Sequence, residues 1–486
     1  RACSWPSLES AERSSLPWMR RSWLKLLSPW RTRSRRSGTV QRQGAAIVWG
    51  WPRRGTIGCV RANVVPTSSS SQPQATWKTA LAVLSLVLAA AIWVSGLVAS
   101  LTRPSVAPTL SLQQQELTLL AEPALPPQLR PLLAGPEPRD LLRQAIQASP
   151  PEQRSERQQR MLTLLSKASD GIHSQGSGAE ADPLIRLLSC EALRGRTDRC
   201  VDPAVSQVAA VRLGLSVLVP LMSIVLGCGL LLRQGWLLLR RRQEPWPSLK
   251  GPALTLIDMA LLVAGGFVVI SAVGVPVVAA PLVRSLTAGL VSPRREAMEV
   301  VIQYSVMALP SLLILRRQLK ALPMERCPPG GWLQWKLRPP ASAMTGAVAA
   351  WLMVTPVVTF TGWLLVRLLG DPGGSNPLLE LVLSSRDPIA LGLMAFTAVV
   401  LAPLFEEVIF RGALLPVLTE SVGVFWGVVL SGLTFGLAHI SIGELAPLTV
   451  LGIGLALMRL SSGRLLPCVL MHALWNAVTF FNLLLL

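Results

Sequence analysis

The chain has 486 residues, of which 51% are hydrophobic and only 15% are charged. An average soluble domain carries roughly 25% charged residues. Several apolar runs are also long enough to cross a bilayer core as helices. The composition therefore excludes an ordinary soluble protein and predicts a polytopic membrane protein.

The formal net charge of +20 would suit a nucleic-acid-binding protein, but its distribution argues against that class. Residues 1–62 hold thirteen Lys or Arg and two acidic residues, and much of the remaining basic excess lies in short loops between apolar runs. This is the positive-inside pattern of membrane proteins. We therefore expect a lipid bilayer as the partner of this chain and no nucleic acid.

Residues 1–75 are basic, rich in Arg, Ser and Trp, and lack periodicity. We expect either a disordered, transit-like tail or a misassigned start, and we make no fold prediction there. The first predicted membrane helix, 76–101, is too long for a cleaved signal peptide.

A polar segment, residues 102–206, follows the first predicted membrane helix. Its twelve basic and twelve acidic residues cancel, and stretches such as "PRDLLRQAIQA" predict a small helical extramembrane domain. Cys190 and Cys200 in this segment could form a disulfide or remain two thiols, because spacing alone does not decide between them.

Two regions hold the remaining apolar runs. Residues 207–340 contain runs near 208–232, 253–283 and 297–315, and residues 341–486 contain runs near 341–369, 388–418, 421–440, 445–460 and 464–486. The predicted fold is an all-α polytopic membrane protein with about eight to nine transmembrane helices and one helical extramembrane domain between the first two.

Two basic loops predict the orientation of the chain. Residues 233–250 carry five basic residues and one acidic residue, and residues 316–340 carry six and one. Basic loops favour the cytoplasmic side. We therefore expect a cytoplasmic N-terminus, with the 102–206 segment on the opposite side of the membrane.

The stretch "LAPLFEEVIFRG" places three charges inside an apolar run. Each central charge costs roughly 2.5–3.5 kcal/mol on the insertion scale, so such residues normally face the interior of the helix bundle. Glu407 and Arg411 are four residues apart, where they can pair on one helical face. Glu406 is rotated by about 100° from Glu407, so it remains available for chemistry.

Two further polar pairs lie in the following predicted helices. "FGLAH" places Phe435 and His439 at i and i+4, and "HALWN" does the same for His472 and Asn476. The chain has three His, and the third lies in the polar 102–206 segment. At about 1.5 Å per residue, Glu406 and the two membrane His can reach similar depths.

Together these residues suit hydrolytic chemistry. A buried carboxylate with a neighbouring His can activate water as a general base. A His and an Asn one turn apart can donate to one oxygen, which suits an oxyanion. Glu406, His439 and His472 could equally bind Zn²⁺, although the sequence contains no HExxH, no GxSxG and no glycine-rich phosphate motif.

The ordered set EExxxR, FxxxH and HxxxN resembles the CPBP family, which comprises type II CAAX prenyl endopeptidases and bacteriocin-processing or immunity proteins, also called the ABI family. The resemblance covers about residues 388–482, and all the motif positions are present. It implies an intramembrane protease fold and a membrane-associated protein or peptide substrate, with prenylated CAAX proteins as the best-known examples.

The resemblance also implies roles for individual residues. Glu406 and His439 would activate the hydrolytic water, and His472 and Asn476 would stabilise the oxyanion. Glu407, Arg411 and Phe435 would be supporting residues. We favour a metal-free reaction with no cofactor and keep zinc as the alternative. A non-catalytic immunity or scaffold protein is the alternative function, and a transporter ranks last, because the polar residues gather in the C-terminal helices only.

Overall fold

The computed structural model describes residues 76–486, apart from positions 104, 136, 150, 171–181, 196–199, 241–245, 371–372 and 374–376. The expectations for residues 1–75 and for His173 lie outside the described residues. The regular elements that are described are all helices, and no strand occurs among these residues. The predicted all-α fold is thus confirmed.

Eight helices in the described part of the chain are long and apolar enough to cross a membrane. They are Thr76–Ser100 (α2), Pro203–Leu239 (α8), Leu256–Leu286 (α9 to α11), Arg294–Lys320 (α12), Pro340–Leu369 (α13), Pro388–Val422 (α15 to α17), Ile442–Ser462 (α19) and Leu466–Leu485 (α20). This agrees with the predicted number, and the chain is an integral membrane protein.

The region 421–440, predicted as a separate membrane helix, is shorter in the structure. Helix α18 covers Val424–Leu437 and has 14 residues, so it is about 21 Å long. The hydrocarbon core of a bilayer is roughly 30 Å thick. Gly423, with a φ of 84°, ends α17 (Leu415–Val422) and precedes α18. Helix α18 is therefore too short to span a bilayer alone.

The span Pro388–Val422 is not a uniform α-helix. After α15 (Pro388–Phe396), the π-helical segment η8 (Thr397–Leu401) precedes α16 (Ala402–Glu407), and a second π-helical segment, η9 (Val408–Leu414), follows it. Such widened turns are rare and are frequently found at functional sites. The two glutamates of the EExxxR motif are the last two residues of α16, the short α-helix between the two π-helical segments.

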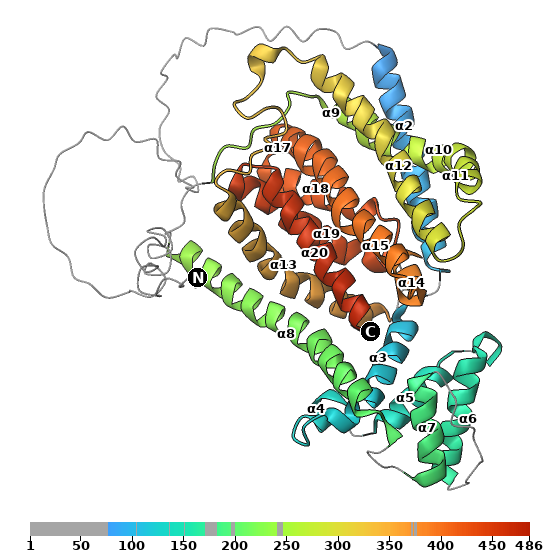
Figure 1. Ribbon diagram of the computed structural model, residues 1–486. Helices are drawn as coiled ribbons and strands as arrows, with labels where there is room; N and C mark the ends of the chain where they lie inside the picture. The colour runs from blue at the N-terminus through green and yellow to red at the C-terminus, as the bar shows by residue number, and fades with distance from the viewer. Residues whose placement is uncertain are drawn as a thin grey trace, which may run out of the picture. The chain divides into compact units, whose positions relative to one another are not determined.

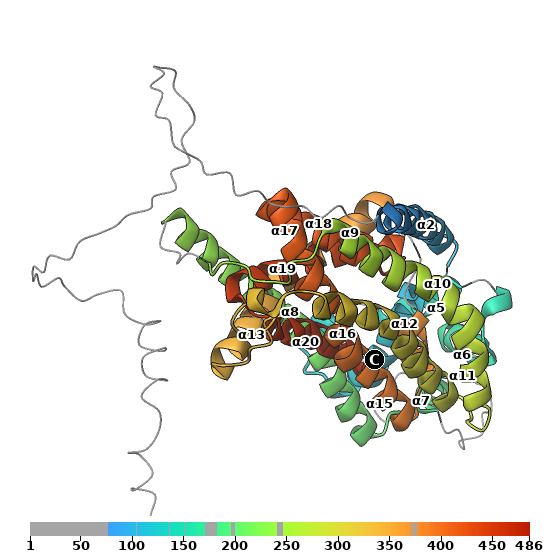
Figure 2. The same cartoon turned by 90° about the horizontal axis from the view of Figure 1, so that it is seen from above.

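The C-terminal helices pack closely around this broken span. Helix α18 packs against α17 and α19, and α13 packs against α8, α19 and α20 (Figure 1). In the view from above, α12, α15, α16 and α20 lie in the same central region of the helix bundle (Figure 2). A Cβ on Gly452 of α19 would lie 2.9 Å from the Gly432 Cα of α18, so small residues allow the two backbones to approach closely.

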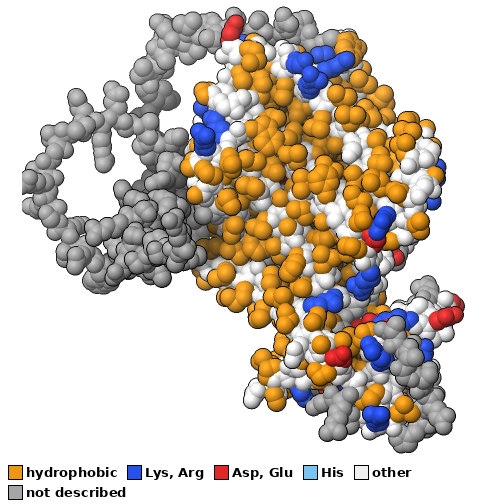
Figure 3. All heavy atoms as spheres, viewed as in Figure 1, with side chains coloured by type: hydrophobic (Ala, Val, Ile, Leu, Met, Phe, Trp, Pro, Cys, Tyr) orange, Lys and Arg blue, Asp and Glu red, His pale blue; other side chains and the backbone are white. Residues whose placement is uncertain are grey.

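The outer surface of the membrane helices is apolar. Figure 3 shows a largely hydrophobic face, with Lys and Arg side chains gathered towards its ends. Large exposed hydrophobic residues occur along α2, α8 and α13, including Val87, Leu232 and Trp363. In water such a surface would be unfavourable, whereas lipid chains solvate it.

The polar segment between α2 and α8 forms several short helices. They are α3 (Ala107–Ala121), η2 (Glu122–Ala124), α4 (Arg130–Leu133), α5 (Pro138–Gln147), η3 (Pro151–Gln153), α6 (Glu156–Asp170) and α7 (Pro183–Arg194). A hydrophobic cluster that includes Leu119, Leu142, Met161 and Leu188 joins α3, α5, α6 and α7. The segment thus has an apolar core of its own.

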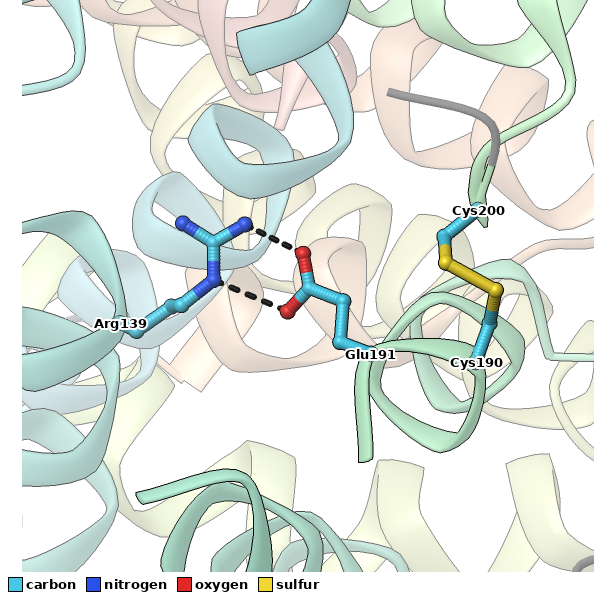
Figure 4. Close-up of a disulfide and its surroundings, with 4 residues drawn as sticks. All are labelled: Arg139, Cys190, Glu191 and Cys200. Carbon is cyan, nitrogen blue, oxygen red and sulfur yellow. Dashed lines mark hydrogen bonds and ion pairs between the residues drawn. A yellow bond between two sulfur atoms is a disulfide. The ribbon is translucent and has the colours of Figure 1, made fainter. Parts of the chain in front are cut away.

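A disulfide and a buried ion pair reinforce this helical segment. Cys190 of α7 is bonded to Cys200, so the two cysteines are not separate thiols (Figure 4). Beside them, Arg139 of α5 donates from Nε to Glu191 Oε2 at 2.9 Å and from Nη2 to Glu191 Oε1 at 2.5 Å. A third nitrogen, Nη1, donates to Glu122 Oε2 at 2.8 Å.

Candidate active site

The EExxxR motif lies in the interior of the helix bundle. Glu407 and Arg411 have no exposed surface, and Glu406 is 8% exposed. Arg411 Nη1 donates to Glu407 Oε1 at 2.8 Å, which is the ion pair that their i, i+4 spacing predicts. Arg411 Nη2 donates to the Gly452 carbonyl at 3.0 Å and so links α19 to the motif. This arrangement neutralises Glu407 and fixes Arg411.

His472 of α20 contacts both glutamates. Its Nδ1 lies 3.0 Å from Glu407 Oε1, and its Nε2 lies 3.9 Å from Glu406 Oε2. The first distance is a hydrogen bond, whereas the second is too long for one. The gap between these two atoms is closed to solvent, because Glu406 Oε2 has almost no accessible surface. His472 is 3% exposed, so the whole arrangement is buried.

The two oxygens of Glu406 differ in their surroundings. Oε1 accepts a hydrogen bond from the Tyr304 hydroxyl of α12 at 2.5 Å. Oε2 is buried and has no hydrogen-bond partner among the described residues. Buried carboxylate oxygens normally have partners, and an exception calls for an explanation. Here the free oxygen is the one that faces His472, which leaves it available to a water or a substrate.

Phe435 of α18 lies in the centre of the motif residues. Its ring is fully buried and makes edge contacts with the rings of His439 and His472, at centroid distances of 5.0 and 5.5 Å. The guanidinium carbon of Arg411 lies 4.4 Å from the ring centroid of Phe435, a cation–π geometry. One aromatic ring therefore sets the spacing between the two His and the arginine.

His439 and Asn476 are held by backbone carbonyls. His439 Nδ1 lies 2.9 Å from the Phe435 carbonyl, and the ring is partly exposed. Asn476 Nδ2 donates to the Ala398 carbonyl of η8 at 2.7 Å. No hydrogen bond joins either residue to Glu406 within the described ranges. The structure thus brings Glu406, Glu407, Arg411, Phe435 and His472 into direct contact and connects His439 to them through Phe435.

Tyr304 is the contact that the sequence analysis missed. It lies 102 positions before Glu406, on α12, and no local spacing relates the two residues. One signal was present, because Tyr304 is the only tyrosine of the chain and lies in an apolar run. A buried tyrosine hydroxyl usually has a hydrogen-bond partner, so it predicts a polar partner without identifying it.

The zinc alternative can be tested on the geometry. Structural and catalytic zinc sites need at least three protein ligands that converge on one point. No group of three or more His, Cys, Asp or Glu in the described part of the chain is close enough to hold a metal ion. Glu406, His439 and His472 therefore do not fit a zinc site in this arrangement.

Comparisons with known proteins match two parts of the chain. Residues 388–478 match the family described as type II CAAX prenyl endopeptidase Rce1-like, and residues 107–180 match a domain of unknown function (DUF8675). No curated protein and no solved structure matches the chain. The Rce1-like range contains every predicted site residue, whereas Tyr304 lies outside it. The predicted family is thus confirmed for this region: the C-terminal membrane helices are Rce1-like, consistent with the CPBP family.

Proposed function

We propose that the Rce1-like region is an intramembrane endopeptidase that hydrolyses a peptide bond of a membrane-associated protein with a glutamate-activated water. The observation that carries this proposal is the free Oε2 of Glu406, which is buried and lies 3.9 Å from His472 Nε2. Glu407 Oε2 is also unpaired among the described residues, but Glu407 Oε1 is held by Arg411 and His472, so Glu406 is the glutamate to which no basic side chain is hydrogen-bonded.

Glu406 is the general base of the proposed reaction. A water between Glu406 Oε2 and His472 Nε2 gives one proton to the carboxylate, and its oxygen attacks the carbonyl carbon of the scissile bond. Glu406 then gives this proton to the amide nitrogen as the carbon–nitrogen bond breaks. The products are a new carboxyl group and a new amine. We propose that His439, whose Nδ1 bonds to the Phe435 carbonyl, orients the same water through Nε2.

His472 and Asn476 are the proposed donors to the oxyanion. Glu407 accepts from His472 Nδ1, and Arg411 supplies the compensating positive charge. When His472 is doubly protonated, Nε2 can donate to the oxyanion, whose negative charge balances the imidazolium. The Asn476 amide, anchored on Ala398, has a second N–H to offer. Preorganised donors of this kind stabilise the tetrahedral intermediate.

The proposed substrate is a protein held at the membrane, because the site is buried among membrane helices. The family description points to prenylated CAAX proteins as the first class to test. The proposed orientation has a cytoplasmic N-terminus and the 102–206 segment on the other side. The Cys190–Cys200 disulfide supports this, since disulfides persist in oxidising compartments.

The function can be tested with Glu406→Gln, which keeps the size of the side chain and removes the base. Peptides released from membranes would be compared by mass spectrometry for cells that express the wild type or this variant. We expect cleavage to fall by about 10²-fold or more, with unchanged membrane insertion. Glu420→Gln is the matched control, because this glutamate lies in the same span but is exposed.

A non-catalytic immunity or scaffold protein gives a different result. In that case Glu406→Gln changes the stability of the detergent-solubilised protein, and no peptide depends on Glu406. Equal peptide release by the wild type and the variant would therefore refute the proposed peptidase.

A further inference from the structure

The residue after His439 has an unusual backbone conformation. Ile440 has a φ of +50°, in the left-handed region. A β-branched residue is a genuine outlier there, because its Cβ substituents crowd the backbone. Helices that end with a left-handed residue normally use glycine or asparagine. Such strain persists only where the surroundings enforce it, and it often occurs at functional sites.

The enforcing contacts come from helix α2. A Cβ added to Gly96 would overlap Ile440 Cγ2, so the absence of a side chain at Gly96 creates the space that this isoleucine fills. One turn later, the fully buried Ser100 accepts a hydrogen bond from the Ile442 backbone N–H at 3.0 Å. Ile442 is the first residue of α19, where backbone N–H groups have no partner within the helix.

The held turn is also the one that carries His439. The His439 N–H donates to the Gly436 carbonyl at 3.2 Å, and the Ile440 N–H donates to the Leu437 carbonyl at 3.1 Å. His439 therefore lies in the turn that follows α18, and the direction of its side chain depends on how the chain leaves that turn. Ile440 and Ile442, held by α2, fix the exit.

We propose that α2 is a positioning element of the active site, with Gly96 and Ser100 holding the 440–442 turn so that His439 faces the water of the reaction. The assignment rests on the proposed role of His439. Helix α2 lies outside the Rce1-like range, so the family match gives no indication of this function. Gly96 and Ser100 act through His439 and do not touch the reacting atoms.

Histidine NMR gives a readout that is independent of activity. The chain has only three His, so selective ¹⁵N labelling of the full-length protein in detergent gives three ring systems, assigned by single His→Gln variants. We expect Gly96→Ala to shift the ring signals of His439 and to leave those of His173 unchanged. We expect the double variant with Ile440→Gly to restore the His439 signals, because glycine accepts the left-handed conformation and removes the overlapping methyl group.

Activity follows the same pattern in the proposed reaction. Gly96→Ala should lower kcat by roughly 10²-fold, as expected for a misplaced catalytic group, with KM changed by less than about twofold. Adding Ile440→Gly should recover most of kcat. Gly229→Ala in α8 is the matched control, since a Cβ there meets nothing within 4 Å, and it should leave both readouts unchanged.

The results distinguish a failure of the proposed role of α2 from a failure of the proposed peptidase function. Wild-type His439 signals and kcat in Gly96→Ala overturn the proposal, as does a double variant that stays like Gly96→Ala. If Gly96→Ala does not fold, the double variant decides, because recovery of folding and of the His439 signals requires the contact with Ile440. A wild-type protein without peptidase activity refutes the proposed function, while the NMR comparison still tests the role of α2.

Discussion

Two arginines, Arg139 in the polar segment between α2 and α8 and Arg411 among the membrane helices, are paired in different ways. Arg139 uses all three of its donor nitrogens on Glu122 and Glu191, and both oxygens of Glu191 are occupied. Arg411 leaves its Nε without a partner, and Glu407 Oε2 is also free within the described residues. The first pattern is the bidentate geometry of a structural ion pair.

This difference in the number of unpaired carboxylate oxygens indicates a different role for each cluster. In the polar segment between α2 and α8, both carboxylate oxygens of Glu191 are used to hold α5 against α7. In the membrane, unused acceptor atoms are retained on Glu406 and Glu407, where the desolvation cost of leaving them unpaired is greatest. Retaining spare acceptors at such a cost is reasonable for a site that must accept a proton or a ligand.

The largest expected effect comes from removing Arg411. Arg411→Met leaves Glu407 as an unpaired charge in the bundle interior, which typically costs about 3–5 kcal/mol. We expect a large drop in the thermal midpoint and in the yield of monodisperse protein in detergent. Arg139→Met should cost less, because water can reach the side chains of Arg139 and Glu122, which are 13% and 27% exposed, although Glu191 is only 3% exposed.

A double variant sharpens this comparison. Arg411→Met combined with Glu407→Met removes both charges and should recover part of the lost stability, because no unpaired charge remains while His472 Nδ1 loses its partner. An Arg411→Met protein as stable as the wild type would contradict the view that Glu407 is charged in the folded protein.

The next largest effect concerns the disulfide. Replacing Cys190 and Cys200 by Ala should destabilise the helical segment between α2 and α8 by about 2–4 kcal/mol, because the bond closes a loop with a sequence separation of 10. Hydrogen exchange should accelerate in α7 and remain unchanged in α18 and α19. Faster exchange in the membrane helices would show that the two regions are coupled, and the comparison between them would fail.

Tyr304 tests the membrane side of the comparison. A hydrogen bond to a charged group contributes about 1.5–3 kcal/mol, so Tyr304→Phe should lower kcat by roughly ten- to a hundred-fold if Glu406 is the base. Ser305→Ala is the matched control, since its hydroxyl bonds only to the Val301 carbonyl of its own helix. Equal kcat values for Tyr304→Phe and the wild type would show that the Tyr304 hydroxyl does not contribute to catalysis.

The smallest effect is a pH dependence of the stability of the helical segment between α2 and α8. Burial raises the pKa of Asp182, but hydrogen bonds from Arg157 and from the Leu184 and Ile185 amides lower it by a larger amount. The net pKa therefore lies below its usual value. The stabilisation by this carboxylate is then complete above the unfolded pKa of about 3.9 and is lost as the pH falls through the lower folded value.

Hydrogen exchange in α7 measures this effect when it is corrected for the intrinsic rate at each pH. Protection should fall below about pH 4 in the wild type, and Asp182→Asn should remove that part of the pH dependence. A wild-type protection that is constant down to pH 2 would show that the carboxylate contributes nothing to the stability of α7.

Local patterns in the sequence predicted the fold and part of the site. Long apolar runs identified the membrane helices, and the i, i+4 spacing predicted the Glu407–Arg411 pair because one helical turn brings these positions together. Contacts between distant positions were not predictable. Tyr304 meets Glu406 across 102 residues and His472 meets Glu407 across 65, and these contacts depend on how separate helices pack.

The dependence on helix packing also explains why the spacing predicted the arrangement of His472 and Asn476 only in part. His472 and Asn476 share a helical face, but His472 contacts Glu407 while Asn476 bonds to Ala398. Spacing gives the face of a helix, whereas the neighbouring helix decides which atom is met. The roles of these residues in catalysis remain predictions for the experiments above.

The π-helical segments on either side of Glu406 and Glu407 have a consequence for sequence change. Each widened turn holds one more residue than an α-turn, so losing a residue from η9 would shorten the span by only about 1.5 Å. The same deletion would rotate the following residues by about 100° relative to the glutamates. If the lost residue lies between Val408 and Phe410, Arg411 would stand three residues after Glu407, and its direction towards Gly452 of α19 would change. The bilayer can accommodate a small change in the length of this span, but the site depends on the direction of each side chain around the helix axis. Insertions and deletions between Thr397 and Leu414 should therefore be far more damaging than substitutions of the lipid-facing residues of the span.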